Sequence, residues 1–169
     1  ALRAFISGLF NLRRSGRFLD DAEAYIDTVL TPGLQHALGA HVLKLTSPGV
    51  PDIYQGTERW DDSLVDPDNR RPVDFDAIEA LAERHGSIAE AWEHRRDGAV
   101  KVMVTRALLR LRAEHPELFA AGDYVAVPVE KGSAVAYIRA HDGDALLTIV
   151  GSGVEGLAGV VVTLPERFR

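Results

Sequence analysis

The sequence predicts an α+β protein in which a mostly helical part is followed by a small antiparallel β-domain. Two observations lead to this prediction. Up to about residue 120, apolar residues recur at the three- and four-residue spacing of amphipathic helices. Beyond that point the pattern changes to short β-prone segments separated by glycine-containing turns. We therefore expect two parts, residues 1–120 and residues 121–169.

Helical spacing predicts six helices in the first part. The segment 99–114 is the clearest, because Val100, Val104 and Leu108 fall on one apolar face and the His-Pro pair that follows ends the pattern. Thr-Pro-Gly at 31–33 is expected to break the chain between two of the other helices. The expected ranges are 1–14, 20–30, 34–45, 76–85, 88–96 and 99–114.

Four β segments are expected in the second part. Lys-Gly and Asp-Gly pairs separate the first three of them, and a glycine-rich stretch precedes the fourth. The expected ranges are 123–130, 133–141, 144–151 and 159–165. Because so small a β part buries little surface by itself, we expect it to lean on the helices.

Composition excludes several classes of protein. The 169 residues carry a net charge of −6, which argues against a nucleic-acid footprint because such a footprint needs a basic face. No apolar run approaches the roughly 20 residues that span a bilayer, and the basic residues near the start follow the apolar ones, unlike a signal peptide. The chain has no cysteine, which is compatible with the cytoplasm. Histidines are scattered and no phosphate-binding loop is present, so we expect no metal and no cofactor.

The stretch GVPDIYQGTERWDDSLVDPDNRRPVDF, residues 49–75, gathers most of the polar chemistry. Residues 50–54 are a short strand candidate, and polar groups follow it directly, as they do where ligands bind in parallel α/β folds. Carboxylates, an amide, a guanidinium pair and an indole suit sugars, through forked hydrogen bonds and stacking on a pyranose face. Two carboxylates could also act in glycoside chemistry, but spacing does not choose among Asp52, Glu58, Asp61, Asp62, Asp66 and Asp68.

Two stretches of this sequence resemble a known protein family. LKLTSPGVPDIYQGTERWDDSLVDPDNRRPVDF, residues 43–75, resembles the end of the catalytic barrel in the maltooligosyltrehalose synthases, glucosylmutases of the α-amylase superfamily (glycoside hydrolase family 13). RALLRLRAEHPELFAAGDY, residues 106–124, resembles the same family's last barrel helix and its exit into the C-terminal β-domain. The resemblance runs from about residue 20 to about 150. It implies that residues 1–120 are the helical end of a (β/α)8 barrel, with 50–54 its last strand, and that 121–169 are a partial β-domain.

The resemblance also implies a reaction. The family converts the reducing-end α-1,4 linkage of a maltooligosaccharide to an α,α-1,1 linkage in trehalose biosynthesis, through a retaining mechanism with a glycosyl-enzyme intermediate. Its catalytic carboxylates follow barrel strands four, five and seven, whereas this sequence supplies only strand eight. We therefore expect no catalytic residue in this chain, and we expect the chain alone to be inactive.

Binding residues do carry over. Asp66 and Arg70 match the Asp-Pro-x-x-Arg pair that contacts glucosyl units on the non-reducing side of the cleaved bond in α-amylase relatives. Gln55, Glu58 and Trp60 match the loop after strand eight, near the pocket. Asn69 belongs to the same motif, as does Arg71, without an assigned role. The resemblance thus implies that this chain contributes a substrate-binding rim for a maltooligosaccharide.

Structural explanations for the same residues stay open. Asp66 could only cap a turn, and Arg70 or Arg71 could pair with Asp74 or Asp76 to hold the loop. Glu58 could accept hydrogen bonds from backbone N–H groups. Trp60 could be a packing residue of the core.

Two functional classes follow from these expectations. The first is a C-terminal fragment of a glucosylmutase, which a start at Ala1 without methionine favours. The second is a non-catalytic α-glucan-binding or accessory module, with an ordinary hydrolase or isomerase of the superfamily as a further variant of the enzyme class. In a fragment, one barrel strand would lack neighbours, so residues 50–54 could also stay irregular. Self-association would then be one way to cover missing barrel surface.

Overall fold

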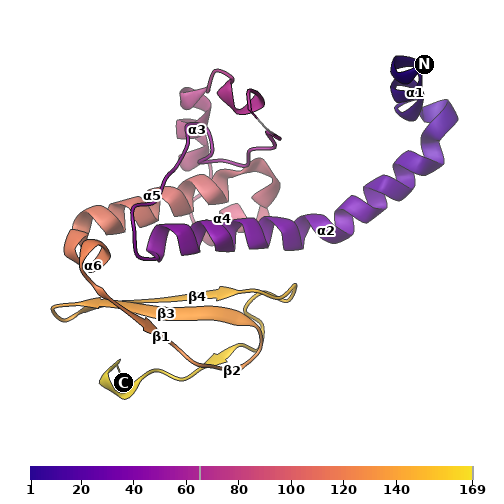
Figure 1. The fold of residues 1–169 in the computed structure, drawn as a ribbon. Coiled ribbons are helices and arrows are strands. Elements are labelled where there is room, and N and C mark those ends of the chain that lie inside the picture. Colours follow the sequence, from indigo (N-terminus) through magenta and orange to yellow (C-terminus); the bar gives the residue numbers. More distant parts are fainter. Residues whose placement is uncertain (65, 169) are drawn as a thin grey trace.

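The computed structural model describes residues 1–64 and 66–168 and shows a layered arrangement (Figure 1). The long helix α2 and helix α5 run side by side, with α3 on one side of them and the strands β1, β3 and β4 on the other. The helices are α1 (Leu2–Leu9), α2 (Leu12–Thr46), α3 (Phe75–Ala82), α4 (Ile88–Glu93), α5 (Ala99–Glu114) and α6 (Pro116–Ala120), with short 3₁₀ turns η1 (Asp68–Arg70), η2 (Arg95–Asp97) and η3 (Glu166–Phe168). The strands are β1 (Asp123–Ala126), β2 (Val129–Lys131), β3 (Ala134–His141), β4 (Asp144–Gly151) and β5 (Val161–Val162).

The expected break at Thr-Pro-Gly is wrong, because α2 continues through Pro32. A proline inside a helix removes one backbone hydrogen bond. The helix can still continue when the residues on both sides of the proline are held in helical conformation. The flank after Pro32 is held by burial, since Leu45 is completely buried and Leu38 packs against the helical core. Tertiary packing therefore outweighs the local breaker.

Helix α5 matches the expected range 99–114. It begins after Gly98, whose φ of 85° is accessible to glycine, and the Asp97 carboxylate accepts a hydrogen bond from the N–H of Ala99 at 2.9 Å. It ends at His115, and Pro116 then opens the short helix α6, which the sequence pattern did not predict. Proline is well suited to the first position of a helix, so the same residue ends one helix and starts the next.

The expected strand at residues 50–54 is absent, and these residues are irregular. A strand needs a partner to satisfy its backbone groups, and no strand of the described chain lies in this loop. Residues 50–54 therefore stay irregular, which was the alternative expectation.

The β part forms two antiparallel sheets among the described residues, one of order β1-β3-β4 and one pairing β2 with β5. The expected segment 123–130 splits at Pro128, so that β1 pairs with β3 and β2 pairs with β5. Strands β3 and β4 meet at Asp142-Gly143, where both residues have positive φ, as a two-residue hairpin turn requires. The mixture of helices with small antiparallel sheets is therefore as predicted.

Two apolar clusters form the core. The helical cluster comprises Ile78, Leu81, Ala82, Ala91, Ala99, Val100 and Val102, with Leu38, Trp60, Val73, Trp92 and Met103 packed against it. The cluster of the β part contains Val127, Ala136 and Ile138. The helices end at Ala120 and the strands begin at Asp123. In the described chain, no helix is both long and apolar enough to cross a membrane.

Hydrogen bonds between polar groups join the helices to the sheet. The Tyr137 hydroxyl on β3 lies 2.7 Å from the Thr46 hydroxyl at the end of α2. The buried Arg139 guanidinium donates hydrogen bonds to the backbone carbonyls of Phe119, Gly122 and Asp123 at 2.9–3.2 Å. The Tyr137 contact fixes the end of α2, from which the polar loop departs, and the Arg139 contacts fix the turn between α6 and β1.

Candidate functional site

The loop that carries the candidate site connects α2 to α3, and cations anchor its first residues. Arg112 on α5 donates to the carbonyl of Leu45 at 2.9 Å and to that of Gly49 at 3.2 Å. Lys44 on α2 donates to the carbonyl of Asp52 at 2.9 Å. Arg112 therefore holds the loop where it leaves α2. Backbone contacts of this kind have no sequence signature.

Trp60 anchors the middle of the loop. Its indole N–H donates to the carbonyl of Arg95 at 2.6 Å, and the ring packs against the helical core. The Lys101 ammonium lies 5.6 Å from the centre of the ring and donates to the carbonyl of Arg59 at 3.1 Å. Trp60 therefore holds the loop against α5, as the structural alternative states.

Between these anchors the loop encloses a small polar hollow of about 150 Å³. Gln55 and Asn69, both predicted site residues, line it together. The full lining is Gln55, Gly56, Arg59, Asp61, Ser63, Asp68, Asn69, Arg71, Pro72 and Val73. The hollow is smaller than the roughly 300 Å³ of ordinary ligand pockets, so it fits part of an oligosaccharide and not a whole one.

Charged groups in the hollow are ordered by the loop itself. The Asp61 carboxylate accepts hydrogen bonds from the Ser63 hydroxyl at 2.6 Å and from its N–H at 3.1 Å. Both bonds favour the ionised form and lower the pKa of Asp61. Arg71 pairs with the Asp68 carboxylate and donates to its carbonyl at 3.0 Å. The hollow thus presents the Asp61 carboxylate as an acceptor and the Arg71 guanidinium as a donor, and such groups suit hydroxyl groups.

Asp66 and Arg70 lie outside this lining and pair with each other. Arg70 Nε lies 2.6 Å from Asp66 Oδ1, and both side chains are more than half exposed. The alternative pairing with Asp74 or Asp76 is wrong for both arginines, because Arg71 pairs with Asp68. Asp74 instead caps α3 by accepting from the N–H of Ala77 at 2.9 Å.

Glu58 is separated from the hollow. It lines a shallow apolar depression beside α5, together with Val102 and Leu109. Its Oε2 is buried and has no hydrogen-bond partner among the residues that the structure describes. Gln55, Glu58 and Trp60, which all lie in this loop, therefore face three different environments.

Sequence reasoning missed Arg59 and Ser63 as members of the hollow and left Asp61 and Asp68 unresolved among six carboxylates. Arg59 precedes Trp60, which is held against α5, so its place follows from that anchor. Ser63 follows Asp61 at the spacing of a local side-chain-to-backbone turn, which is a usable signal in the sequence. Within residues 1–64 and 66–168, no group of three or more possible ligands is arranged to hold a metal ion.

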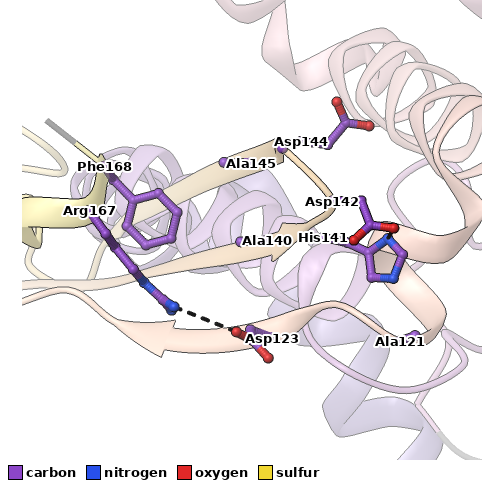
Figure 2. Close-up of a pocket in the computed structure, with 10 residues that line it drawn as sticks. Ala121, Asp123, Ala140, His141, Asp142, Asp144, Ala145, Arg167 and Phe168 are labelled. Atoms are coloured by element: carbon purple, nitrogen blue, oxygen red, sulfur yellow. Dashed lines mark ion pairs between the residues drawn. The ribbon is translucent and has the colours of Figure 1, made fainter.

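A second hollow of about 400 Å³ lies at the end of the β3–β4 hairpin (Figure 2). Figure 2 shows Arg167 reaching from the C-terminal segment toward Asp123, at 3.7 Å, with His141, Asp142 and Asp144 around the hairpin turn. His115 Nδ1 lies 2.8 Å from Asp144 Oδ2. None of the predicted site residues lies here, and we assign this hollow no function.

A comparison with curated proteins finds close similarity in sequence. The chain is 39% identical over 149 residues to a Mycobacterium tuberculosis protein provisionally named maltooligosyl trehalose synthase, and the match covers 79% of this chain and 18% of that protein. A second strain of the same species gives the same values. No family model matches the chain. The resemblance is therefore to a class of sugar-converting enzymes much longer than this chain.

Solved structures point to the same proteins. A variant of the maltooligosyltrehalose synthase from Arthrobacter ramosus matches with a TM-score of 0.72 and 35% identity, over 95% of this chain and 21% of that one. Another maltooligosyl trehalose synthase matches with a TM-score of 0.70 over 90% of this chain and 25% of its own, and its 24% identity shows the fold alone. The resemblance to maltooligosyltrehalose synthase is thus confirmed in sequence and in fold, and the chain spans about a fifth of the length of these relatives.

Proposed function

We propose that this chain is the C-terminal portion of a glucosylmutase of the α-amylase superfamily, and that it supplies part of the substrate-binding rim. The observation that carries the proposal is the similarity to maltooligosyltrehalose synthases in both sequence and fold. The parent enzyme is proposed to act in the cytoplasm, as an isomerase that converts the reducing-end α-1,4 linkage of a maltooligosaccharide to an α,α-1,1 linkage. Residues 1–120 are proposed to be the end of its barrel, and residues 121–169 part of its β-domain.

The proposed division of labour leaves the bond-breaking chemistry outside this chain. In a retaining rearrangement, a carboxylate takes the glycosyl group while an acid protonates the departing glucose oxygen, and the anomeric hydroxyl of that glucose then attacks. Water must be excluded while the glucose turns over. The proposed role of this chain is to hold glucosyl units, through hydrogen bonds to sugar hydroxyls, while the released glucose turns over.

The side chains that line the hollow support this proposed role. The Gln55 and Asn69 amides offer both donors and acceptors, and the Asp61 carboxylate and Arg71 guanidinium lie in the same lining. Asp66 and Arg70 form an exposed pair next to it in sequence. A glucosyl unit that contacts the hollow would extend toward this pair, as the resemblance implies.

Calorimetric titration with maltopentaose tests the proposal. We expect the wild-type chain to bind, and Gln55→Ala to weaken binding about 3- to 10-fold, because one hydrogen bond to a hydroxyl is worth about 0.5–1.5 kcal/mol. The matched control is Gln35→Ala, since Gln35 lies on α2 and outside the hollow. Binding that responds equally to both substitutions, or no binding by the wild-type chain, would argue against the rim.

A further inference from the structure

Two arginine side chains come together where α5 turns into α6, beside strand β3 (Figure 1). Arg112 belongs to the last turn of α5, and its guanidinium carbon lies 4.5 Å from the centre of the Phe119 ring. Arg139 on β3 lies two residues after Tyr137, so both face the helices, and it donates to the Phe119 carbonyl at 3.1 Å. Phe119 therefore contacts both guanidinium groups, which we call the arginine pair.

The arginine pair carries two positive charges without a carboxylate beside them. Every hydrogen bond that the two guanidinium groups make to described residues goes to a backbone carbonyl. The ion pairs between arginine and carboxylate within residues 1–64 and 66–168 involve other arginines. Asp123 is the neighbour most able to help, but its carboxylate faces Arg167 at 3.7 Å. Carbonyl groups carry no net charge, so the positive charge of the pair is not neutralised.

One donor of the pair is buried and unused. Arg139 is only 1% exposed, and its Nη1 has no hydrogen-bond partner among the residues that the structure describes. Buried donors in proteins are nearly always paired, so an unpaired one calls for a bound ion or an ordered water. Burial and the charge of Arg139 also lower the pKa of Arg112. Both observations indicate a place that negative charge would stabilise.

A hollow of about 400 Å³ opens next to the arginine pair. Arg112 and Phe119 line it, together with Gly49, Val50, Pro116 and Ala120. Among the described residues of this lining only Arg112 is charged, so no carboxylate of the lining would repel an anion. We call this space the arginine hollow. Its volume is that of an ordinary small-ligand pocket and exceeds what a phosphate group needs.

We propose that the arginine hollow binds a phosphate group, held by Arg112 and stabilised by the charge and the unused donor of Arg139. A guanidinium carries five N–H donors, and the bonds of Arg112 to described residues use two of them. Arginine suits phosphate because its planar fork matches the spacing of two phosphate oxygens. The inference is independent of the proposed sugar-binding rim, because the two hollows share no lining residue.

Titration of the full 169-residue chain with inorganic phosphate tests the site. Chloride holds the ionic strength constant, so that general screening does not mimic binding. Calorimetry gives the dissociation constant, and nuclear magnetic resonance spectra of the isotope-labelled chain locate the ligand. We expect saturable binding, with backbone N–H shifts concentrated at residues 49–50 and 117–120.

Ala120→Glu places a carboxylate at the exposed edge of the arginine hollow without removing any anchor of the loop. The new carboxylate supplies the missing counter-charge and repels an anion, so phosphate binding should weaken by about tenfold or more. The matched control is Ala113→Glu, which makes the same change of charge at an exposed position of α5 outside this lining. The control should alter the dissociation constant by less than about twofold, because salt screens distant surface charges. Both variants should keep the wild-type circular dichroism spectrum.

Glucose 6-phosphate is the second ligand and distinguishes the source of the phosphate group. Binding about tenfold tighter than that of inorganic phosphate identifies a phosphorylated sugar, and equal binding identifies the free ion; either result supports the site. The proposal is overturned if phosphate gives no more signal than chloride, if both variants weaken binding equally, or if the shifts lie away from the arginine hollow. Titration with maltopentaose probes other residues, so its failure would count against the rim and not against the phosphate site.

Discussion

At the scale of single residues, burial decides which polar side chains stabilise the fold and which stay accessible to a ligand. The buried His41 on α2 illustrates the first kind. The Thr105 hydroxyl gives its one proton to the carbonyl of Lys101, so His41 Nε2, 2.7 Å away, must be the donor to that hydroxyl. Burial, together with the charges of Lys101 and Lys44, lowers the pKa of His41 to about 4.

The pKa of His41 predicts a pH dependence of stability. Because the folded-state pKa lies below the value of about 6.5 in an unfolded chain, the unfolded state binds more protons between these two pH values. The free energy of unfolding should therefore fall as the pH drops from about 6.5 to 4, by roughly 2–3 kcal/mol. Urea denaturation of the wild-type chain and of His41→Gln at several pH values measures this.

The variant separates the histidine from other titrating groups. Glutamine keeps an N–H donor for the Thr105 hydroxyl but does not titrate. The difference in unfolding free energy between the two chains should change over this pH window and be constant above it. A difference that is constant across the whole range would exclude His41 as the source.

At the scale of elements, the close approach of α2 to β4 joins the helical part to the sheet. A Cβ added at Gly39 would lie only 2.6 Å from Val150 Cγ1, so the glycine is needed for the contact. Gly33 lies in the same helix and has nothing within 4 Å of its would-be Cβ. Two glycines of one helix thus differ only in what they face.

This contrast gives opposite predictions for one substitution. Gly39→Ala should lower the free energy of unfolding by about 1–3 kcal/mol, because the sheet must shift to admit the methyl group. Gly33→Ala should raise it by about 0.4–1 kcal/mol, through helix propensity and a less flexible unfolded chain. Thermal and urea denaturation of both variants measure the two effects.

A second substitution checks the cause. Val150→Ala shortens the side chain that the new methyl group would meet, so Gly39→Ala should cost less in that background than in the wild-type chain. Equal effects in both backgrounds, or a stabilising Gly39→Ala, would place the origin of the effect elsewhere.

The elements also show what sequence patterns can and cannot predict. The bounds of α5 and of the β3–β4 hairpin follow from periodicity and turn residues, because these elements satisfy their own backbone groups locally. The continuity of α2 through Pro32 could not be predicted, since it depends on packing far along the chain. The same holds for residues 50–54, which are irregular because they pair with no strand among the described residues.

For the candidate site, the loop and its polar character could be predicted, but the grouping of its side chains could not. Gln55 and Asn69 meet in one hollow, while Trp60 turns to the core and Glu58 turns to α5. These directions depend on a hydrogen bond to the carbonyl of Arg95, more than thirty residues further along the chain. Backbone acceptors of this kind are not visible in residue types.

At the scale of the whole molecule, we propose that the chain supplies a sugar-contacting rim and that the catalytic residues lie outside it. The rim depends on a loop that its own anchors hold in place. Arg112, Lys44 and Trp60 bind backbone carbonyls of the loop or of the helices beside it. The rim should therefore bind sugar even when the catalytic part is absent.

One measurement tests this central claim most directly: nuclear magnetic resonance spectra of the isotope-labelled chain during titration with maltopentaose. We expect shifts concentrated between residues 55 and 71, with no anomeric signal of an α,α-1,1 linkage after prolonged incubation. Shifts spread evenly over the chain, or none at saturating sugar, would contradict the rim. The appearance of the α,α-1,1 signal would contradict the placement of the catalytic carboxylates outside these 169 residues.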